Sequence, residues 1–308
     1  MRPAFSVIFF TTLSGAGYGM LFWLGLHYAW QPLPLSREFA LILFLLALAL
    51  VSIGLLSSLL HLGKPARAWR ALSQWQSSWL SREGVLAVTC YAPALSLMSL
   101  IWFGALSLPA QALGALLALT ALATVSATAM IYASLRTIPA WHDWRVLPVY
   151  LLYSLLSGGL LVMSLLALTG WRAPTMALYV AGIGFIALAG LKLSYWLALN
   201  TLPQVPERAS AVGLPAGSTV RGFERPHTEQ SFITREMGFV LARKHARVLR
   251  LTAITMSVAL PLLALLISTR QAPLISLLAA AVALLFGTII ERWLFFAEAR
   301  HVVMRYYP

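Results

Sequence analysis

The stretch EFALILFLLALALVSIGLLSSLL, residues 38–60, carries a charged residue only at its first position. A helix needs about 20 apolar residues to cross the hydrocarbon core of a bilayer. Because lipid offers the backbone no hydrogen-bond partners, a run of this length must be helical. Similar runs occur at roughly 4–30, 84–106, 111–135, 147–168, 176–199, 250–268 and 273–297. The sequence therefore predicts an all-α integral membrane protein, a bundle of eight transmembrane helices.

The composition supports this fold class. The 308 residues are 60% hydrophobic and 10% charged, whereas soluble domains carry about 25% charged residues. No boundary or repeat divides the chain, so residues 1–308 are predicted to form a single membrane domain with an insertion at about 200–249. The first part of the insertion is rich in Pro, Gly and Ser and is predicted to be irregular. Its second part, SFITREMGFVLARKHARVLR, is either an interfacial amphipathic helix or a charged loop.

Positive charge gathers at one face of the predicted bundle. If the spans alternate in direction, 18 of the 22 Lys and Arg residues lie at that face, whereas Arg37, Arg172 and Arg270 lie at the other and Lys192 lies inside the sixth span. Cytoplasmic loops are rich in Lys and Arg, so both termini and the insertion are predicted to be cytoplasmic, in a bacterial inner membrane. The 18 residues are Arg2, Lys64, Arg67, Arg70, Arg82, Arg136, Arg145, Arg208, Arg221, Arg225, Arg235, Arg243, Lys244, Arg247, Arg250, Arg292, Arg300 and Arg305.

The net charge of +13 would suggest a nucleic-acid partner in a soluble protein. Here the topology accounts for it, so membrane lipid is an expected partner and nucleic acid is not. The chain has one cysteine, Cys90, whereas an iron–sulfur cluster takes several Cys ligands. The six histidines are all predicted near span ends or in loops, where they cannot hold a haem buried between helices. We therefore expect neither haem nor an iron–sulfur cluster in this chain.

The segment richest in residues that could take part in chemistry is SSLLHLGKPARAWRALSQWQSSWLSREG, residues 57–84. His61 ends the second predicted span and Glu83 opens the third, so both are predicted at the same membrane depth. An acid at the mouth of an apolar helix is costly unless it is paired, hydrated or functional, although a helix N-terminus also stabilises a carboxylate. An imidazole and a carboxylate at the lipid boundary can exchange protons with a hydrophobic molecule such as a quinone, whose reduction takes up two protons with two electrons.

Two further segments lie at the same predicted face. In RTIPAWHDWRVLP, residues 136–148, two prolines bracket a short connector in which Trp141 and Trp144 can lie at the membrane interface. In GTIIERWLFFAEARH, residues 287–301, Glu291 and Arg292 fall in the last turns of the eighth span. They form either an interfacial pair or an inward-facing site in which Arg292 reaches a bound headgroup.

These segments resemble the membrane anchor subunit of the dimethyl sulfoxide reductase family, the molybdenum–iron–sulfur oxidoreductases. HLGKPARA at 61–68, with the acid Glu83 following, is similar to the family motif H-L-G-x-P-x-R-A and its later acid. TIPAW at 137–141 is similar to T-x-P-x-W, and IIERWLFF at 289–296 to I-x-x-R-x-x-F-[FY]. The resemblance extends over nearly the whole chain in the number and order of spans.

The resemblance implies an eight-helix anchor that binds ubiquinone or menaquinone. It also implies two partners, an iron–sulfur electron-transfer subunit and a molybdopterin catalytic subunit. The family's quinone-site histidine and glutamate match His61 and Glu83, to which we add Arg292. The insertion is long for a chain with otherwise short loops and suggests a docking surface. The residues expected to dock the partners are Lys64, Arg67, Arg70, Trp141, Arg243 and Lys244.

The motif-bearing loop lies at the positive face, whereas the well-known dimethyl sulfoxide reductases hold their catalytic subunits outside the cytoplasm. The long insertion and the IIERWLFFAEA ending resemble the branch of bacterial membrane-bound sulfite-oxidising enzymes. We therefore expect sulfite oxidation coupled to quinone reduction. The alternative is an anchor of a dimethyl sulfoxide or other S- or N-oxide reductase that oxidises menaquinol. A transporter, the more distant alternative, would show ionisable residues at mid-membrane or broken helices in matching halves. No nucleophile, metal cluster or phosphate loop indicates a stand-alone enzyme.

Overall fold

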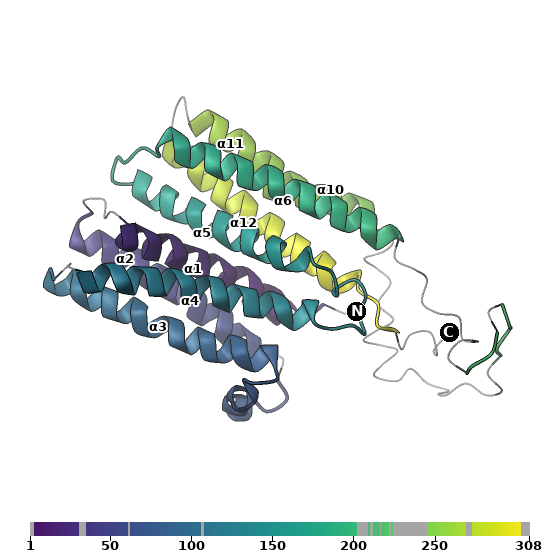
Figure 1. The fold of residues 1–308 in the computed structure, drawn as a ribbon. Helices are drawn as coiled ribbons and strands as arrows, with labels where there is room; N and C mark the ends of the chain where they lie inside the picture. The colour runs from purple at the N-terminus through teal and green to yellow at the C-terminus, as the bar shows by residue number, and fades with distance from the viewer. Residues whose placement is uncertain are drawn as a thin grey trace.

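The computed structural model of the protein describes residues 3–30, 35–60, 62–105, 108–201, 209, 212–215, 217–221, 223, 245–268 and 273–302. Within these residues, eight helical rods are long and apolar enough to cross a membrane, which confirms the predicted all-α bundle (Figure 1). The rods are α1 (Phe5–Trp30), α2 (Arg37–Leu59), α3 (Trp79–Phe103), α4 (Leu108–Ala133), α5 (Val146–Ala167), α6 (Thr175–Thr201), α10 with η2 and α11 (Ala246–Ile254, Thr255–Ala259, Leu260–Ser268) and α12 (Pro273–Ala297).

The largest difference from the predicted spans is at the start of α3. The apolar run predicts a start at 84, but the helix begins at Trp79 because Ser78 caps it, with its side chain accepting a hydrogen bond from the Ser81 N–H. Ser81 and Arg82 make this first turn too polar to be recognised by its hydrophobicity. Glu83 therefore lies in the second turn of α3 and not at its mouth.

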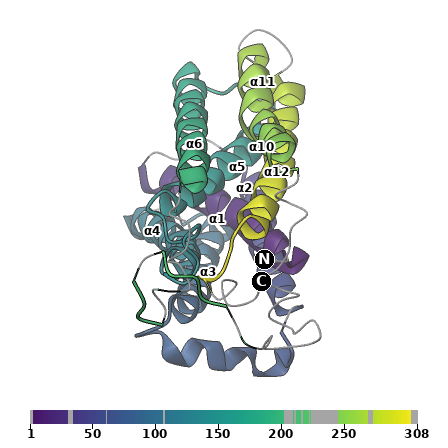
Figure 2. The same ribbon diagram turned by 90° about the vertical axis from the view of Figure 1, so that its right-hand side faces the viewer.

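Helix α1 lies at the centre of the bundle and packs against α2, α4, α5 and α12. Seen along the helix axes, α1–α4 form one half and α6, α10, α11 and α12 form the other, with α5 between them (Figure 2). Helices α1 and α10 begin, and α6 and α12 end, at the same end of the bundle, which we call the terminal end (Figure 1). The interior is correspondingly divided into two apolar clusters, one mainly around α1–α4 and one among α5, α6, α11 and α12.

Two glycine pairs set how closely α1 approaches its neighbours. Gly19 of α1 faces Gly158 of α5 so closely that a Cβ on either residue would overlap the backbone of the other helix. Gly25 of α1 faces Gly114 of α4, and a Cβ on Gly25 would lie 2.6 Å from the Gly114 carbonyl oxygen. Small residues allow this backbone contact between membrane helices, where no hydrophobic force drives association.

The seventh rod contains Pro261 and remains one continuous rod, as the sequence predicts. Proline cannot donate the usual helical hydrogen bond, and its ring clashes with the carbonyl four residues earlier. The chain accommodates this with the π-helical turn η2 just before the proline, where the Leu260 N–H donates to the Thr255 carbonyl. This turn packs against α12, where a Cβ on Gly287 would lie 2.5 Å from the Ser257 nitrogen.

A short 3₁₀ helix, η1 (Pro65–Gln74), lies between α2 and α3 at the terminal end of the bundle (Figure 2). Its residues are exposed, apart from the half-buried Ala68. Arg82 of α3 fixes the segment after η1, because its guanidinium donates to the carbonyls of Trp75 at 3.0 Å and Gln76 at 2.6 Å. This loop, which carries most of the predicted motif, is therefore attached to the first turn of α3.

We predict that Gly19→Ala lowers the thermal stability of the purified protein in detergent. The added methyl group meets the α5 backbone, which cannot move aside as a flexible side chain can. Overpacking typically costs about 1–3 kcal/mol. The matched control is Gly190→Ala, because no atom lies within 4 Å of a Cβ built on Gly190. Equal unfolding temperatures for the two variants would contradict the close α1–α5 contact.

Candidate functional site

Glu83 lies inside the bundle and is 5% exposed. Its carboxyl oxygen Oε1 is 2.6 Å from the Thr128 hydroxyl of α4. No ion pair reaches Glu83 among the residues that the structure describes. The neighbouring Arg82 points outward instead, with its guanidinium 4.4 Å from the centre of the Trp79 ring. The two adjacent charges thus point to opposite sides of α3, one to the interior and one to the membrane boundary.

The other half of the predicted acid–imidazole pair, His61, lies outside the described residues. So do Arg243 and Lys244 and most of the predicted amphipathic segment, of which only its end is described, at the start of α10. The pairing of His61 with Glu83 therefore stays a prediction.

Three of the predicted docking residues lie together at η1. Lys64 precedes this helix, Arg67 and Arg70 belong to it, and all three are exposed. Trp69 and Trp75 are 67% and 56% exposed beside them. Cations and indole rings on one exposed segment suit a membrane interface and remain available to a partner.

Trp141, another of the predicted docking residues, is buried within this subunit. Its side chain is 5% exposed, and its indole N–H donates to the Phe295 carbonyl at 2.9 Å. The ring also stacks on Phe295 at 5.7 Å between centroids. The aromatic residue therefore holds the connector between α4 and α5 against the end of α12. Trp144, which is 69% exposed, is the tryptophan of this connector that faces outward.

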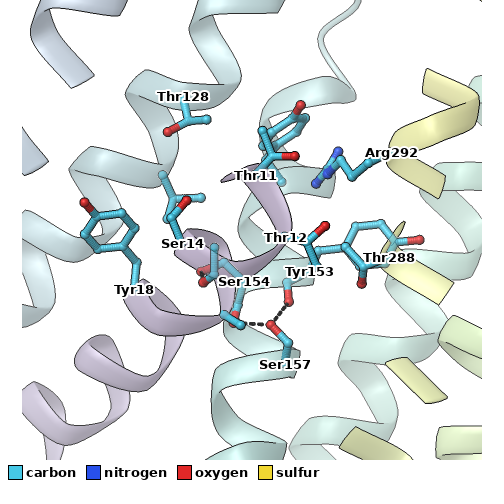
Figure 3. A pocket seen from close by; sticks show the side chains of 14 residues that line it. Thr11, Thr12, Ser14, Tyr18, Thr128, Tyr153, Ser154, Ser157, Thr288 and Arg292 are labelled. Carbon is cyan, nitrogen blue, oxygen red and sulfur yellow. Dashed lines mark hydrogen bonds between the residues drawn. The ribbon is translucent and has the colours of Figure 1, made fainter. Parts of the chain in front are cut away.

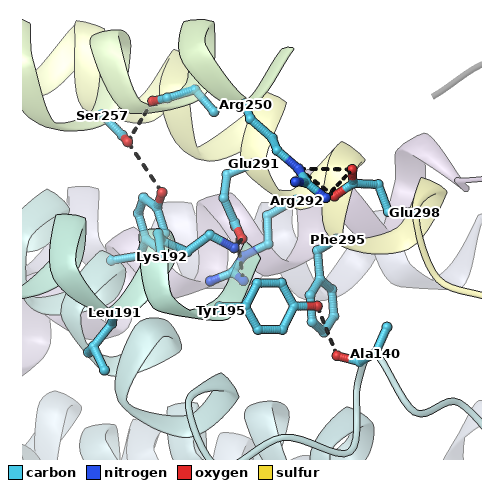
Figure 4. A network of polar contacts seen from close by, with 12 residues as sticks. Ala140, Leu191, Lys192, Tyr195, Arg250, Ser257, Glu291, Arg292, Phe295 and Glu298 are labelled. Atoms are coloured by element: carbon cyan, nitrogen blue, oxygen red, sulfur yellow. Dashed lines mark hydrogen bonds and ion pairs between the residues drawn. The ribbon is translucent and has the colours of Figure 1, made fainter. Parts of the chain in front are cut away.

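The last turns of α12 contain a buried cluster of charges that the sequence alone does not connect (Figure 4). The Lys192 ammonium of α6 is 2.5 Å from Glu291 Oε1, and the Arg292 guanidinium is 3.2 Å from Glu291 Oε2. The side chains of all three are at most 3% exposed. Arg292 also lies over the Tyr150 ring of α5, 3.4 Å from its centroid. The cluster carries two cations and one carboxylate, a surplus of one positive charge.

The sequence predicts that Glu291 and Arg292 form either an interfacial pair or an inward-facing site. In the structure they are both buried and paired with each other, and contact of Arg292 with a bound headgroup stays a prediction. Their partner Lys192 lies in the sixth span, as the sequence predicts, but the sequence does not indicate the contact. Unpaired charges inside a membrane are costly, so a lone Lys in one span and a lone Glu in another are a signal for such a pair. The separation of 99 positions between them in the sequence and the unknown rotation of each helix obscure that signal.

Arg292 borders a polar cavity at the centre of the bundle (Figure 3). The cavity has a volume of about 10 Å³, close to what one water molecule requires. Most of its lining residues carry hydroxyl groups and come from α1, α4, α5 and α12, although apolar atoms make up much of the wall. Thr11 of α1 lies between Thr128 and Arg292 in Figure 3, with Thr12 and Ser14 beside it. Thr128 is also the residue that contacts Glu83, so the cavity separates the buried acid from the buried arginine.

A second cavity of about 10 Å³ shares Tyr150 and Arg292 with the first as lining residues. It is lined by all three charged residues of the cluster and by Arg145. Arg145 immediately precedes α5 and forms an ion pair with Asp143 at 2.8 Å, in which the two side chains are 20% and 18% exposed. This second cavity therefore lies between the buried charges and the half-exposed connector at the terminal end of the bundle.

A third cavity is larger and chemically different. It has a volume of about 590 Å³ and lies among α1, α5 and α6. Its lining is almost wholly apolar, with Trp23, His27 and Trp171 as the exceptions to an aliphatic wall. The Trp23 indole N–H already donates to the Leu155 carbonyl. His27 and Trp171 lie toward the end of the bundle opposite to η1, so this cavity suits a hydrocarbon chain and lies away from Glu83.

Comparisons with known proteins agree with the predicted resemblance. The family described as DMSO reductase anchor subunit (DmsC) matches residues 1–297. The C subunit of the sulfite dehydrogenase of Allochromatium vinosum is 33% identical over 330 aligned residues, which cover 100% of this chain and 99% of that protein. Anaerobic dimethyl sulfoxide reductase chain YnfH of Escherichia coli K12 is 29% identical over 171 residues, 53% of this chain and 58% of that one.

The charge cluster predicts an order of stabilities. Glu291→Gln leaves two buried cations without a counter-charge, so it should be strongly destabilising, by about 3–5 kcal/mol as for other broken buried pairs. Lys192→Met should cost less, because Glu291 and Arg292 remain as a neutral pair. Thermal unfolding of the purified variants measures both effects. Glu38→Gln is the control, because its pair with Arg37 is exposed. The reverse order for Glu291→Gln and Lys192→Met would refute the proposed charge balance.

Proposed function

Because this chain belongs to the DMSO reductase anchor subunit family and is the membrane anchor of a complex of that family, we propose that it transfers electrons between an iron–sulfur partner subunit and membrane quinone. The molybdopterin catalytic subunit would perform the chemistry on the soluble substrate. The observation that carries the proposal is Glu83, a buried carboxyl group next to the exposed motif loop at the terminal end of the bundle. A carboxyl group in that position can supply a proton where electrons arrive from a docked partner.

Burial without a cationic partner favours the protonated acid at Glu83, and the contact with Thr128 is compatible with that form. The Thr128 hydroxyl has one proton, and two acceptors are near it: Glu83 Oε1 at 2.6 Å and the Thr124 carbonyl at 3.1 Å. A protonated Glu83 would donate to the Thr128 oxygen and leave the Thr128 proton for Thr124, so that every group is satisfied. Burial of a carboxylate without a cation would be costly. We infer that Glu83 rests as a neutral acid, ready to give a proton.

In this proposal, His61 hydrogen-bonds one carbonyl of the quinone and Glu83 orients or recharges the imidazole. Reduction of the quinone takes two electrons from the iron–sulfur subunit and two protons from these groups. An imidazole titrates near neutral pH and can be recharged from the adjoining water. The buried Arg292 would act on the headgroup by its charge across the polar interior.

Sulfite is the proposed soluble substrate, because the similarity to the sulfite dehydrogenase protein of Allochromatium vinosum extends over the full length of both chains. Oxidation of sulfite to sulfate releases two electrons, which is what one quinone accepts. The alternative direction, oxidation of menaquinol by a dimethyl sulfoxide reductase, has support from the similarity to YnfH, which covers about half of each chain. Docking of the partners is proposed at Lys64, Arg67 and Arg70, at the positive end of the bundle, and at Arg243 and Lys244 of the insertion.

The large apolar cavity is the competing location for a quinone. Its lining contains no carboxyl group, and it lies toward the end opposite to η1. A quinone there would be farther from a partner docked at η1. We therefore assign the reacting headgroup to the Glu83 end.

We predict that His61→Ala and Glu83→Gln lower quinone-linked turnover of the purified complex. Loss of a positioned proton-transfer group typically costs about 10²–10⁴-fold. Oxidation of the soluble substrate with an artificial acceptor, which bypasses this subunit, should stay near the wild-type rate. Glu38→Gln is the matched control, because Glu38 is an exposed acid at the start of α2.

Two outcomes would reject this site. One is full quinone-linked activity in His61→Ala and Glu83→Gln. The other is loss of quinone-linked activity when Ala177→Trp fills the large apolar cavity, while Glu83→Gln stays active.

The proposed orientation has its own test. With 18 cations at one face and three at the other, both termini should be cytoplasmic. A fusion after Pro308 should therefore be active with a cytoplasmic reporter and inactive with a periplasmic one. The opposite pattern would move the partner subunits out of the cytoplasm and remove the main support for sulfite over dimethyl sulfoxide.

A further inference from the structure

The buried polar atoms without a hydrogen-bond partner gather in one region of the bundle. In the part of the chain that the structure describes, they include atoms of Thr12, Tyr18, Arg145, Tyr150, Glu291 and Arg292. Every one of these residues lines one of the two small polar cavities. Buried polar groups in proteins are almost always satisfied, by protein or by ordered water. Each of the two cavities has about the volume that one water requires, and each is bordered by residues whose polar atoms lack a partner.

Tyr150 joins the two cavities. It lines both of them, its hydroxyl is among the unpartnered atoms, and it is 3% exposed. A tyrosine hydroxyl can accept one hydrogen bond and donate another. It can thus connect a water in the first cavity with a water in the second without any movement of the backbone.

The two ends of this arrangement differ in chemistry. The inner cavity ends at Thr128, which contacts the carboxyl group of Glu83. The outer cavity ends at Arg145, whose partner Asp143 lies on the half-exposed connector. Arg292 borders both cavities and belongs to the cluster with one surplus positive charge.

We propose that the two cavities hold a water-mediated proton path, from the connector at Asp143 and Arg145 through Tyr150 and Thr12 to Glu83. This inference rests on the proposed function, in which Glu83 gives its proton to the quinone. It adds the route by which that proton is replaced.

The path replaces the proton that Glu83 loses in the proposed reaction. When the iron–sulfur partner supplies electrons to the quinone, the O–H bond of Glu83 breaks and an O–H bond forms on the quinone oxygen. A water in the inner cavity then gives a proton to the carboxylate by way of Thr128, and that proton is replaced through Tyr150 from the outer cavity. The net result is uptake of a proton from the aqueous side at the terminal end of the bundle.

The test follows the carboxyl group of Glu83 by infrared difference spectroscopy of the intact complex in membranes, with quinone as acceptor. The C=O band that Glu83→Gln removes is assigned to Glu83, and its shift after transfer to D₂O gives the rate of proton exchange. Tyr150→Phe and Thr12→Val each remove the relevant hydroxyl and keep the shape of the side chain. Each should slow the exchange on the order of tenfold or more, which is about 1.4 kcal/mol in the barrier, and slow quinone-linked turnover with it.

The matched controls are Tyr91→Phe and Thr120→Val. The Tyr91 hydroxyl bonds to Ser52, the Thr120 hydroxyl bonds to carbonyls of its own helix, and neither residue lines the two cavities. Both controls should keep the wild-type exchange rate. Wild-type exchange in Tyr150→Phe and Thr12→Val, or equal slowing in the controls, would overturn the path.

These outcomes separate the path from the proposed function. If Glu83→Gln abolishes quinone-linked turnover but the Tyr150 and Thr12 variants exchange normally, only the path is wrong. If Glu83→Gln keeps full quinone-linked turnover, the proposed role of Glu83 is wrong, and no path that reprotonates it is needed for turnover.

Discussion

The constraint on which this structure depends is that polar groups inside a membrane must find partners inside the protein. Many hydroxyls do so locally, as Thr120, Ser126 and Ser164 do by donating to carbonyls of their own helices. Charged side chains cannot be satisfied in this way. They are gathered instead between helices, where Lys192 and Glu291 join α6 to α12. The ion pair therefore fixes the position of the outer helix α6, which otherwise packs mainly through apolar side chains against α5.

The close approach of α1 to its neighbours makes the polar interior possible. Because Gly19 and Gly158 bring the α1 and α5 backbones together, Ser154 of α5 can donate to the Gly15 carbonyl of α1 at 2.7 Å. A larger residue at this contact would separate the helices and open the space around it to lipid or water. The glycine contact thus keeps the inner cavity at the size of a single water. Gly19 and Gly158 therefore determine both how closely the two backbones pack and which polar groups can reach one another across the contact.

The sequence predicts the spans well because a long apolar run has only one stable structure in lipid. It predicts less well what each residue faces. Glu83 lies a turn deeper than expected because Ser78, a polar cap, starts the helix before the apolar run begins. Tryptophan is common at the membrane interface, which is why the sequence places Trp141 there, but the same ring and N–H suit a buried contact with Phe295. The rotation of each helix is set by contacts between distant segments, and one sequence does not contain that information.

The bundle separates two kinds of interior along its length. Glu83, the charge cluster and both small cavities lie toward the end at which α1 begins, α12 ends and η1 lies. The other end holds the large apolar cavity. Glu83 and the charge cluster thus lie toward one end of the bundle, from which the proposed path would reach one aqueous side. A chain built in this way can exchange protons with that side while its apolar half remains a barrier, so electron transfer to a quinone at Glu83 would take its protons from the face where the partners dock.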